Sequence, residues 1–160
     1  MADIGSGTGL LSKLFLQNGN IVFGVESNDE MRFFAEKSLA KFPKFASVNA
    51  TAEHTTLGDA TIDLVTVGQA LHWFDPETAS REFSRILKTN GHLCVVYNDR
   101  DKNDAFMKDY DHVIRKRAKD RANVPEVNDH YLSRFFRDAK YSRFQLSSKQ
   151  LLNFEGLLGR

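Results

Sequence analysis

The glycine-rich run at residues 3–9, Asp-Ile-Gly-Ser-Gly-Thr-Gly, constrains this chain more than any other feature. It stands between a short apolar segment and an amphipathic segment at residues 8–18, so it predicts a tight turn from a strand into a helix. Such a turn requires residues without side chains, and it lets backbone N–H groups and the helix amino end approach a ligand closely. We interpret the run as a nucleotide cradle.

The spacing of the glycines separates several classes of nucleotide site. In the dinucleotide pattern G-x-G-x-x-G the third glycine would stand at position 10, which is Leu10, and Gly9 comes one place early. A nicotinamide-dependent dehydrogenase is therefore disfavoured, and a nucleotide-binding oxidoreductase is kept as the alternative function. The phosphate-binding loop of nucleoside triphosphatases requires a Gly-Lys dipeptide, which the sequence lacks.

Apolar and amphipathic segments alternate along the first 98 residues. After the first short strand, the pattern predicts strands at 21–25, 45–50, 62–68 and 93–97. It predicts helices at 8–18, from about 28 to Pro43, from Asp75 to Asn90, and over about 103–120. Strands and helices in this rhythm are typical of right-handed βαβ units, so the predicted fold class is α/β with a mostly parallel sheet.

Local signals predict the helix ends and the buried positions. Ser27 and Glu30 have capping-box spacing, Asp75 and Pro76 provide a cap and a first helical residue, and Asn90-Gly91 is a stop. The apolar faces of the first two helices are expected to be buried: Leu10, Leu11, Leu14 and Phe15, then Met31, Phe34, Ala35 and Leu39. A core position is also expected for Cys94 and for three later aromatic residues, Phe135, Phe136 and Phe144, which have a substrate cap as their alternative role.

Glu26 is the second residue that indicates a ligand. It follows the predicted strand at 21–25 directly and lies 17 residues beyond Gly9. A carboxylate at the carboxyl end of the neighbouring strand can accept hydrogen bonds from both ribose hydroxyls of a nucleoside in the crevice. The glycine turn and Glu26 together therefore predict a nucleoside site.

Five motifs in order resemble the class I S-adenosylmethionine-dependent methyltransferases. They are the glycine run, Gly-Val-Glu at 24–26, Asn-Ala-Thr-Ala-Glu at 49–53 followed by Ile-Asp-Leu-Val at 62–65, Gln-Ala-Leu-His-Trp-Phe at 69–74, and Leu-Lys-Thr-Asn-Gly-His-Leu at 87–93. The Ala-x-His-Trp-Phe stretch is similar to the "type 11" subgroup, whose relatives include trans-aconitate methyltransferase-like proteins. The resemblance covers residues 1–98 well and implies a Rossmann-like three-layer αβα sandwich.

The resemblance also implies roles for individual residues. S-adenosyl-L-methionine would be the cofactor, and the acceptor a small molecule. The implied cofactor contacts are Asp3, Gly5, Ser6, Gly7 and Gly9 beside the methionine and ribose, Glu26 on the ribose, Ser27 and Met31 beside the adenine, Thr51, Ala52 and Glu53 at its amino edge, and Gln69 and Ala70 facing the sulfonium. The family often has Asp where this chain has Thr51.

The residues after the fourth strand are the candidates for the acceptor site. Methyl transfer from a sulfonium is an in-line displacement with a good leaving group, so positioning can supply most of the catalysis. A base would assist a hydroxyl or amine acceptor, and His72 is the candidate catalytic residue. His72, Trp73 and Phe74 are expected to line the acceptor pocket, although packing of this turn against the next helix stays an alternative.

Composition excludes several other classes. A formal net charge of +1 argues against nucleic-acid binding by bulk electrostatics, a single cysteine allows no internal disulfide, and no Cys/His cluster has zinc spacing. No apolar run is long enough for a membrane helix and no signal peptide is evident, so a cytoplasmic location is expected. The oligomeric state cannot be read from the sequence.

The domain organisation is expected to be a single truncated domain over residues 1–160. Residues 1–98 would be the cofactor-binding core, and 99–160 a helical segment on the substrate side. The first strand is short and no strand follows the fifth, so the final antiparallel strands of the family are expected to be missing. A truncated chain that binds cofactor without activity is the other alternative.

Overall fold

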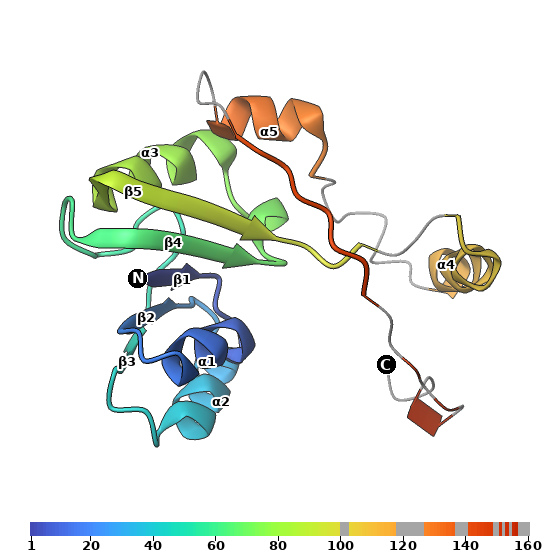
Figure 1. The fold of residues 1–160 in the computed structure, drawn as a ribbon, viewed down its shortest axis with the longest axis horizontal. Helices are drawn as coiled ribbons and strands as arrows, with labels where there is room; N and C mark the ends of the chain where they lie inside the picture. Colours follow the sequence, from blue (N-terminus) through green and yellow to red (C-terminus); the bar gives the residue numbers. More distant parts are fainter. Residues whose placement is uncertain are drawn as a thin grey trace.

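Five parallel strands form one sheet in the computed structural model, which describes residues 1–99, 103–117, 127–136, 141–148, 151, 153, 155 and 156. The strands are β1 (Ala2–Ile4), β2 (Val22–Val25), β3 (Phe45–Val48), β4 (Ile62–Gly68) and β5 (Leu87–Val96). Their order across the sheet is β3-β2-β1-β4-β5, and every neighbouring pair is parallel (Figure 1). The predicted α/β fold with a Rossmann-like sheet is confirmed.

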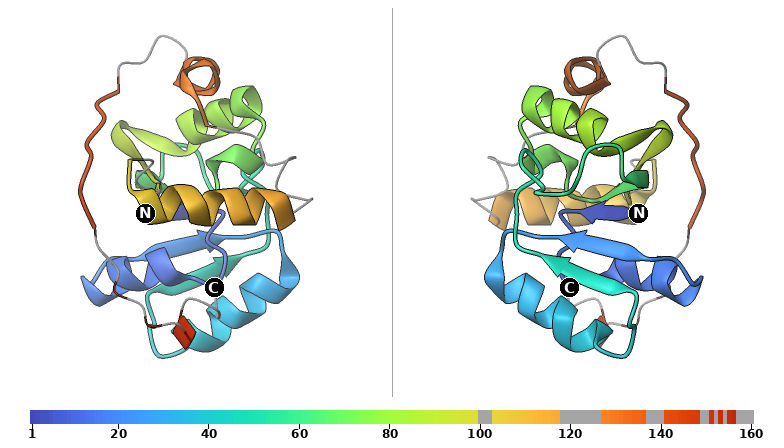
Figure 2. Two further views of the ribbon diagram at one scale, coloured as in Figure 1. Left: turned by 90° about the vertical axis from the view of Figure 1, so that its right-hand side faces the viewer. Right: turned by 90° about the vertical axis from the view of Figure 1, so that its left-hand side faces the viewer.

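Helices cover both faces of this sheet. They are α1 (Leu10–Gln17), α2 (Asp29–Leu39), α3 (Pro76–Ile86), α4 (Ala105–Arg117) and α5 (Asp129–Phe136), with a 3₁₀ turn, η1, at Leu71–Trp73. The chain moves outward from β1 to β3, then returns to β4 and moves the opposite way to β5. Since crossovers are right-handed, α1 and α2 lie on one face and α3 on the other. Figure 2 shows α1 and α2 beside β2 and β3, and α3 and α5 over the other half of the sheet.

Two apolar clusters hold the layers together. The smaller one joins Leu16 of α1 and Leu39 of α2 to Val22 of β2. The larger one lies under α3 and extends to α5; its members include Val65, Val67, Phe83, Ile86, Leu132 and Phe135. The aromatic rings of Phe83 and Phe135 meet edge to face with centroids 5.7 Å apart, so α5 packs on α3. Figure 1 shows α4 standing away from the sheet.

The sheet order creates a switch point between β1 and β4, where the chain reverses direction. From β1 the chain leaves toward β2, and from β4 it leaves toward β5, so the two connections diverge at the carboxyl ends of adjacent strands. Ligands of doubly wound α/β proteins bind at this topological switch point. The glycine turn after β1 and the residues after β4 therefore meet at one edge of the sheet.

Some predicted core positions are wrong, and their neighbours explain why. In α1 the buried residues are Ser12 and Leu16, whereas Leu10 and Leu14 are 76% and 62% exposed, because the helix turns its Ser12 face to the sheet. Cys94 is exposed, since Leu93 and Val95 take the buried face of β5.

In α2 only Ala35 and Leu39 are buried. Phe34 is 58% exposed because it lies on the outer side of the helix, and Met31 is 46% exposed because it lies in the first turn, beside Gly7. In the later residues Phe135 is 1% exposed, which confirms its core position, and Phe136 packs against the same cluster. Phe144 is 87% exposed, which contradicts the prediction for that residue.

The helix ends also differ in part from the sequence prediction. Asp75 caps α3 as predicted, accepting a hydrogen bond from the Thr78 N–H at 2.9 Å. In α2 the cap is Asn28 and not Ser27, because the Asn28 side chain accepts from the Met31 N–H at 3.0 Å.

The predicted stop at Asn90-Gly91 is wrong, since α3 ends at Ile86 and both residues lie inside β5. The β4–β5 register shifts between Ile62 and Leu64, and a Cβ on Gly91 would lie 3.1 Å from the Ile62 carbonyl oxygen. This glycine therefore marks an irregular strand pairing. The helix predicted at about 103–120 corresponds to α4 as far as Arg117, and its last three residues lie outside the described part of the chain.

Candidate functional site

The glycine turn leaves β1 and crosses the carboxyl end of β2. The N–H groups of Gly5 and Ser6 both donate to the Val25 carbonyl, at 2.9 and 3.1 Å, and the Gly9 N–H donates to the Ser6 carbonyl at 2.9 Å. The glycines at positions 5, 7 and 9 have φ angles of +66°, +55° and +81°. Glycine adopts these left-handed angles readily because it has no side chain, which explains why the turn has glycine at these positions.

Gly5 also lies in close contact with the residues that follow β4. A Cβ built on Gly5 would come within 2.6 Å of the Ala70 Cβ and 3.1 Å of the Phe74 ring. The Gly5 backbone therefore packs directly against the side chains of Ala70 and Phe74, and position 5 has no room for a larger residue. This contact brings the first and fourth predicted motifs together.

Glu26 is bound to the glycine turn. Its Oε2 accepts from the Gly7 N–H at 2.8 Å, and its Oε1 accepts from the Asn28 N–H at 2.8 Å. Arg32 donates to the Glu26 backbone carbonyl at 3.2 Å, which fixes the same corner. The structure thus brings Glu26 to the turn, and its contact with a ribose stays a prediction.

Asp3 lies in the interior behind the turn. Its carboxylate is 1% exposed and accepts hydrogen bonds from the hydroxyls of Ser12 on α1 at 2.6 Å and Thr66 on β4 at 3.2 Å. Burial raises the pKa of Asp3, and the two hydroxyls act in the opposite direction. The side chain joins three elements beneath the glycine turn, and the predicted cofactor contact of Asp3 stays untested.

The predicted adenine-side residues are placed unequally. Met31 lies near the turn, since its Sδ would be 3.9 Å from a Cβ on Gly7. Ser27 is exposed between β2 and α2. In the loop after β3, Thr51 is exposed and Ala52 is buried, while the Glu53 carboxylate accepts from the Asp75 N–H at 3.0 Å. The structure therefore directs Glu53 toward the start of α3.

The residues after β4 differ in exposure. Gln69 is exposed and has a φ of +57°, an uncommon angle for a residue with a side chain, and its N–H donates to the Val96 carbonyl at 3.0 Å. Ala70 is buried against Gly5, and Phe74 packs on Gly5 and on the Phe83 ring. Positive φ angles in residues with side chains, as at Gln69, are concentrated at functional sites.

The side chain of His72 lies between two aromatic rings. Trp73, which is 65% exposed, has its ring centroid 4.7 Å from the imidazole. The Tyr97 hydroxyl lies 3.0 Å from Nδ1 of His72 and 3.2 Å from the His72 backbone nitrogen. Burial lowers the pKa of His72, so the imidazole is neutral at pH 7.

Several residues of this site were not found from the sequence. The Asn28 N–H donates a hydrogen bond to one carboxylate oxygen of Glu26. The hydroxyls of Tyr97 and Tyr131 form hydrogen bonds with the backbone of the turn that contains His72. Tyr131 of α5 donates to the Leu71 carbonyl at 2.6 Å and lies 3.0 Å from the Phe74 carbonyl. The position of Tyr97 at the carboxyl end of β5, next to the end of β4, is a signal that could have identified it.

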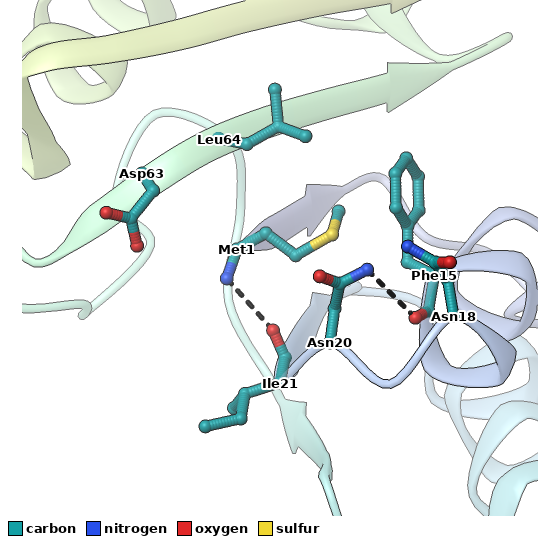
Figure 3. Close-up of a pocket in the computed structure, with 7 residues that line it drawn as sticks. All are labelled: Met1, Phe15, Asn18, Asn20, Ile21, Asp63 and Leu64. Carbon is teal, nitrogen blue, oxygen red and sulfur yellow. Dashed lines mark hydrogen bonds between the residues drawn. The ribbon is translucent and has the colours of Figure 1, made fainter.

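A hollow of about 470 Å³ lies at the opposite ends of the strands (Figure 3). Its lining is Met1, Phe15, Asn18, Asn20, Ile21, Asp63 and Leu64. The Asp63 carboxylate pairs with Lys88 at 2.6 Å, and the Asn20 amide donates to the Phe15 carbonyl at 3.1 Å. This hollow contains none of the predicted site residues, which gather at the carboxyl ends.

Comparison with known proteins agrees with the geometry at the carboxyl ends. The sequence pattern described as "Methyltransferase domain" matches residues 2–95. An uncharacterized methyltransferase of Mycobacterium tuberculosis is 33% identical over 127 residues, which is 78% of this chain and 51% of that protein. An uncharacterized methyltransferase of Schizosaccharomyces pombe is 30% identical over 115 residues, 71% of this chain and 45% of that one.

Solved structures give the same result. The YcgJ protein of Bacillus subtilis has a TM-score of 0.67 and 26% identity, over 85% of this chain and 58% of that chain. An S-adenosylmethionine-dependent methyltransferase of Thermotoga maritima has a TM-score of 0.62 and 25% identity, over 89% of this chain and 63% of that one.

The chain spans about half the length of the curated relatives it matches. Within the described residues, no helix is both long and apolar enough to cross a membrane.

Proposed function

The chain belongs to the methyltransferase-domain family, and from this we propose that it transfers a methyl group from S-adenosyl-L-methionine to a small-molecule acceptor. Residues 1–98 would bind the cofactor, and the later residues would contribute to the acceptor side. The trans-aconitate methyltransferase-like subgroup and the truncation of the domain stay predictions. A nicotinamide-dependent oxidoreductase is not favoured, since the matching family model is a methyltransferase domain and the curated relatives described above are named methyltransferases.

The contact between Glu26 and Gly7 carries the proposal. Each carboxylate oxygen of Glu26 accepts one N–H, so each keeps acceptor capacity for a ribose hydroxyl. A Cβ on Gly7 would meet only the Met31 sulfur, at 3.9 Å, so the backbone of the turn faces open space. An acidic acceptor beside an open glycine backbone fits an adenosine bound at the carboxyl ends of β1 and β2.

The other site residues would surround the same ligand. Met31 would lie against the adenine, while Gln69 and Ala70 would face the sulfonium from the end of β4. The bound cofactor would supply an electrophilic methyl group on a sulfonium. The task of these residues is then to hold the acceptor in line with that methyl at a reactive distance and to keep water out.

The turn after β4 is the proposed acceptor side of the site. After the carboxyl end of β4, His72 is half-buried and Trp73 is exposed, and the Phe74 ring packs against Gly5. Tyr131 binds this turn to α5, which supports a role for residues beyond 98 in the acceptor site.

Two titrations and one screen test the proposal. Isothermal calorimetry with S-adenosylhomocysteine should show binding, and calorimetry with a nicotinamide dinucleotide should show none. A methyl-transfer screen against small carboxylic acids, phenols and amines then identifies the acceptor class. Binding of the nicotinamide dinucleotide without binding of S-adenosylhomocysteine would overturn the proposed function.

A further inference from the structure

The Tyr97 hydroxyl occupies an unusual position beside His72. Tyr97 is the first residue after β5, yet its oxygen lies 3.2 Å from the backbone nitrogen of His72 and 3.0 Å from Nδ1 of the same residue. A backbone N–H can only donate, so the Tyr97 oxygen accepts that hydrogen bond. The direction of the second contact then decides which nitrogen of His72 carries the ring proton.

The hydrogen of the Tyr97 hydroxyl favours one direction. Burial raises the pKa of the Tyr97 hydroxyl above its ordinary value, so the group keeps its hydrogen at pH 7 and can donate it. A hydroxyl oxygen has two acceptor lone pairs and one hydrogen. One lone pair accepts the His72 N–H, and among the described contacts Nδ1 of His72, at 3.0 Å, is the acceptor within reach of the hydroxyl hydrogen, so the hydroxyl donates to Nδ1. A neutral imidazole that accepts at Nδ1 carries its own proton on Nε2.

We propose that Tyr97 is a positioning residue that holds His72 in the Nε2–H tautomer, so that His72 donates a hydrogen bond to an oxygen of the methyl acceptor and does not act as a general base. This inference rests on the proposed function for the identity of the reaction. The tautomer itself is a property of the protein alone, and it can be measured without any methyl transfer.

The tautomer has a consequence for the acceptor. A neutral His72 with Nε2–H offers no lone pair outward, so it cannot take a proton from a hydroxyl or an ammonium group. It suits an acceptor oxygen that is already anionic. A lone pair of that oxygen would form the new O–C bond while the S–C bond breaks and the S–C bonding electrons go to sulfur. The negative oxygen and the positive sulfonium would both become neutral, and no proton would be released.

The packing of the turn supports a fixed imidazole. Trp73 stacks at a tilt on His72 with a centroid distance of 4.7 Å, and Tyr131 holds the Leu71 carbonyl at 2.6 Å. The backbone of this turn is therefore bound by two phenol hydroxyls, that of Tyr97 directly after β5 and that of Tyr131 in α5. A residue that donates through a single ring nitrogen requires this kind of constraint.

The first test is two-bond ¹H–¹⁵N correlation NMR of the ¹⁵N-labelled full chain at pH 7. The chain has five histidines, and the His72→Gln variant identifies the His72 signals by their loss. We expect Nδ1 to be the unprotonated nitrogen in the native protein. In Tyr97→Phe the ratio of the two tautomers should shift by roughly fivefold toward Nδ1–H, the effect of losing one hydrogen bond.

Tyr131→Phe is the matched control, since it removes another phenol hydroxyl from the same turn without touching the imidazole. It should leave the His72 tautomer ratio unchanged. A proton on Nδ1 in the native chain overturns the proposal, and so does an equal shift in both tyrosine variants. The native spectrum decides the question even if Tyr97→Phe fails to fold.

The second test uses side chains that separate a donor from a base. Gln can place an amide N–H near the position of Nε2 but cannot accept a proton, so His72→Gln should keep methyl transfer within about tenfold of the native rate, whereas His72→Ala should lose about 100-fold. Equal losses in the two variants overturn the donor role. If no acceptor is methylated by the native chain, the proposed function fails while the NMR result still decides the tautomer.

Discussion

Replacement of Gly5 by alanine tests the contact between the glycine turn and the segment after β4. Gly5 has a φ of +66°, where a Cβ costs roughly 1–2 kcal/mol. The new Cβ would lie 2.6 Å from the Ala70 Cβ, and forcing an extra carbon into a packed site costs about 1–3 kcal/mol more. We therefore expect Gly5→Ala to lower the free energy of unfolding by about 3 kcal/mol.

Gly19→Ala is the matched control for backbone strain. Gly19 follows α1 with a φ of +85°, and a Cβ there would meet no atom within 4 Å. Its cost should be the strain alone, about 1 kcal/mol. The expected difference of about 2 kcal/mol between the two variants corresponds to roughly 4–8 °C in the midpoint of thermal unfolding for a domain of this size.

The assay is thermal and urea unfolding of the native chain and both variants, followed by circular dichroism. Equal destabilisation of Gly5→Ala and Gly19→Ala would refute the reasoning, because it would mean that Ala70 and Phe74 do not press on Gly5. A loss of S-adenosylhomocysteine affinity in Gly5→Ala beyond that in Gly19→Ala would place the contact at the ligand site as well.

Three further outcomes are expected. Glu82→Gln should lower the free energy of unfolding in urea by about 1–3 kcal/mol, because the buried Glu82 carboxylate accepts hydrogen bonds from Arg85 and Thr55. The control is Glu77→Gln, which loses only the exposed ion pair with Arg134 and should change the free energy of unfolding by less than about 1 kcal/mol. Since the Arg85 hydrogen bond lowers the pKa of Glu82 from 4.5 to about 2, the native chain should keep this stabilisation above pH 4.5 and lose it as the pH falls toward 2, whereas acid unfolding of Glu82→Gln should lack that component. Gln69→Gly should raise the unfolding midpoint by relieving a φ of +57°, worth about 1 kcal/mol, while weakening binding of S-adenosylhomocysteine in calorimetry; a lowered midpoint would contradict it.

The sheet and the glycine turn could be predicted because their signals are local. Four apolar runs gave the strands after β1, and β4 coincides with the predicted range at Ile62–Gly68. The glycine spacing and Glu26 were enough to predict their meeting, since the carboxyl ends of adjacent parallel strands share one edge. Asp75 was identified as a cap from its place before a proline.

The remaining features depend on partners that sequence spacing does not reveal. Helical periodicity made Leu10 and Leu14 appear buried, but the buried carboxylate of Asp3 binds Ser12 and fixes the other face of α1 against the sheet. Gly91 looks like a helix stop, yet it lies in a strand because of its close contact with β4.

The contacts of the aromatic groups around the turn after β4 also could not be predicted from sequence spacing. His72 was a candidate from its position alone, and its protonation depends on Tyr97, 25 residues later. Tyr131 comes from a segment with a weak sequence pattern and contacts the turn from 60 residues away. Such hydrogen bonds require the folded arrangement of β5 and α5 around the site.

The most direct test of the proposed cofactor site is the affinity of S-adenosylhomocysteine for the native chain, Glu26→Ala and Glu30→Ala, measured by calorimetry after unfolding curves show that all three are folded. Loss of hydrogen bonds to a charged acceptor should weaken binding to Glu26→Ala by about 10- to 100-fold. Glu30, an exposed acid at the start of α2, is the control and should leave the affinity unchanged. Native affinity in Glu26→Ala would contradict the assignment of this carboxylate to the ribose.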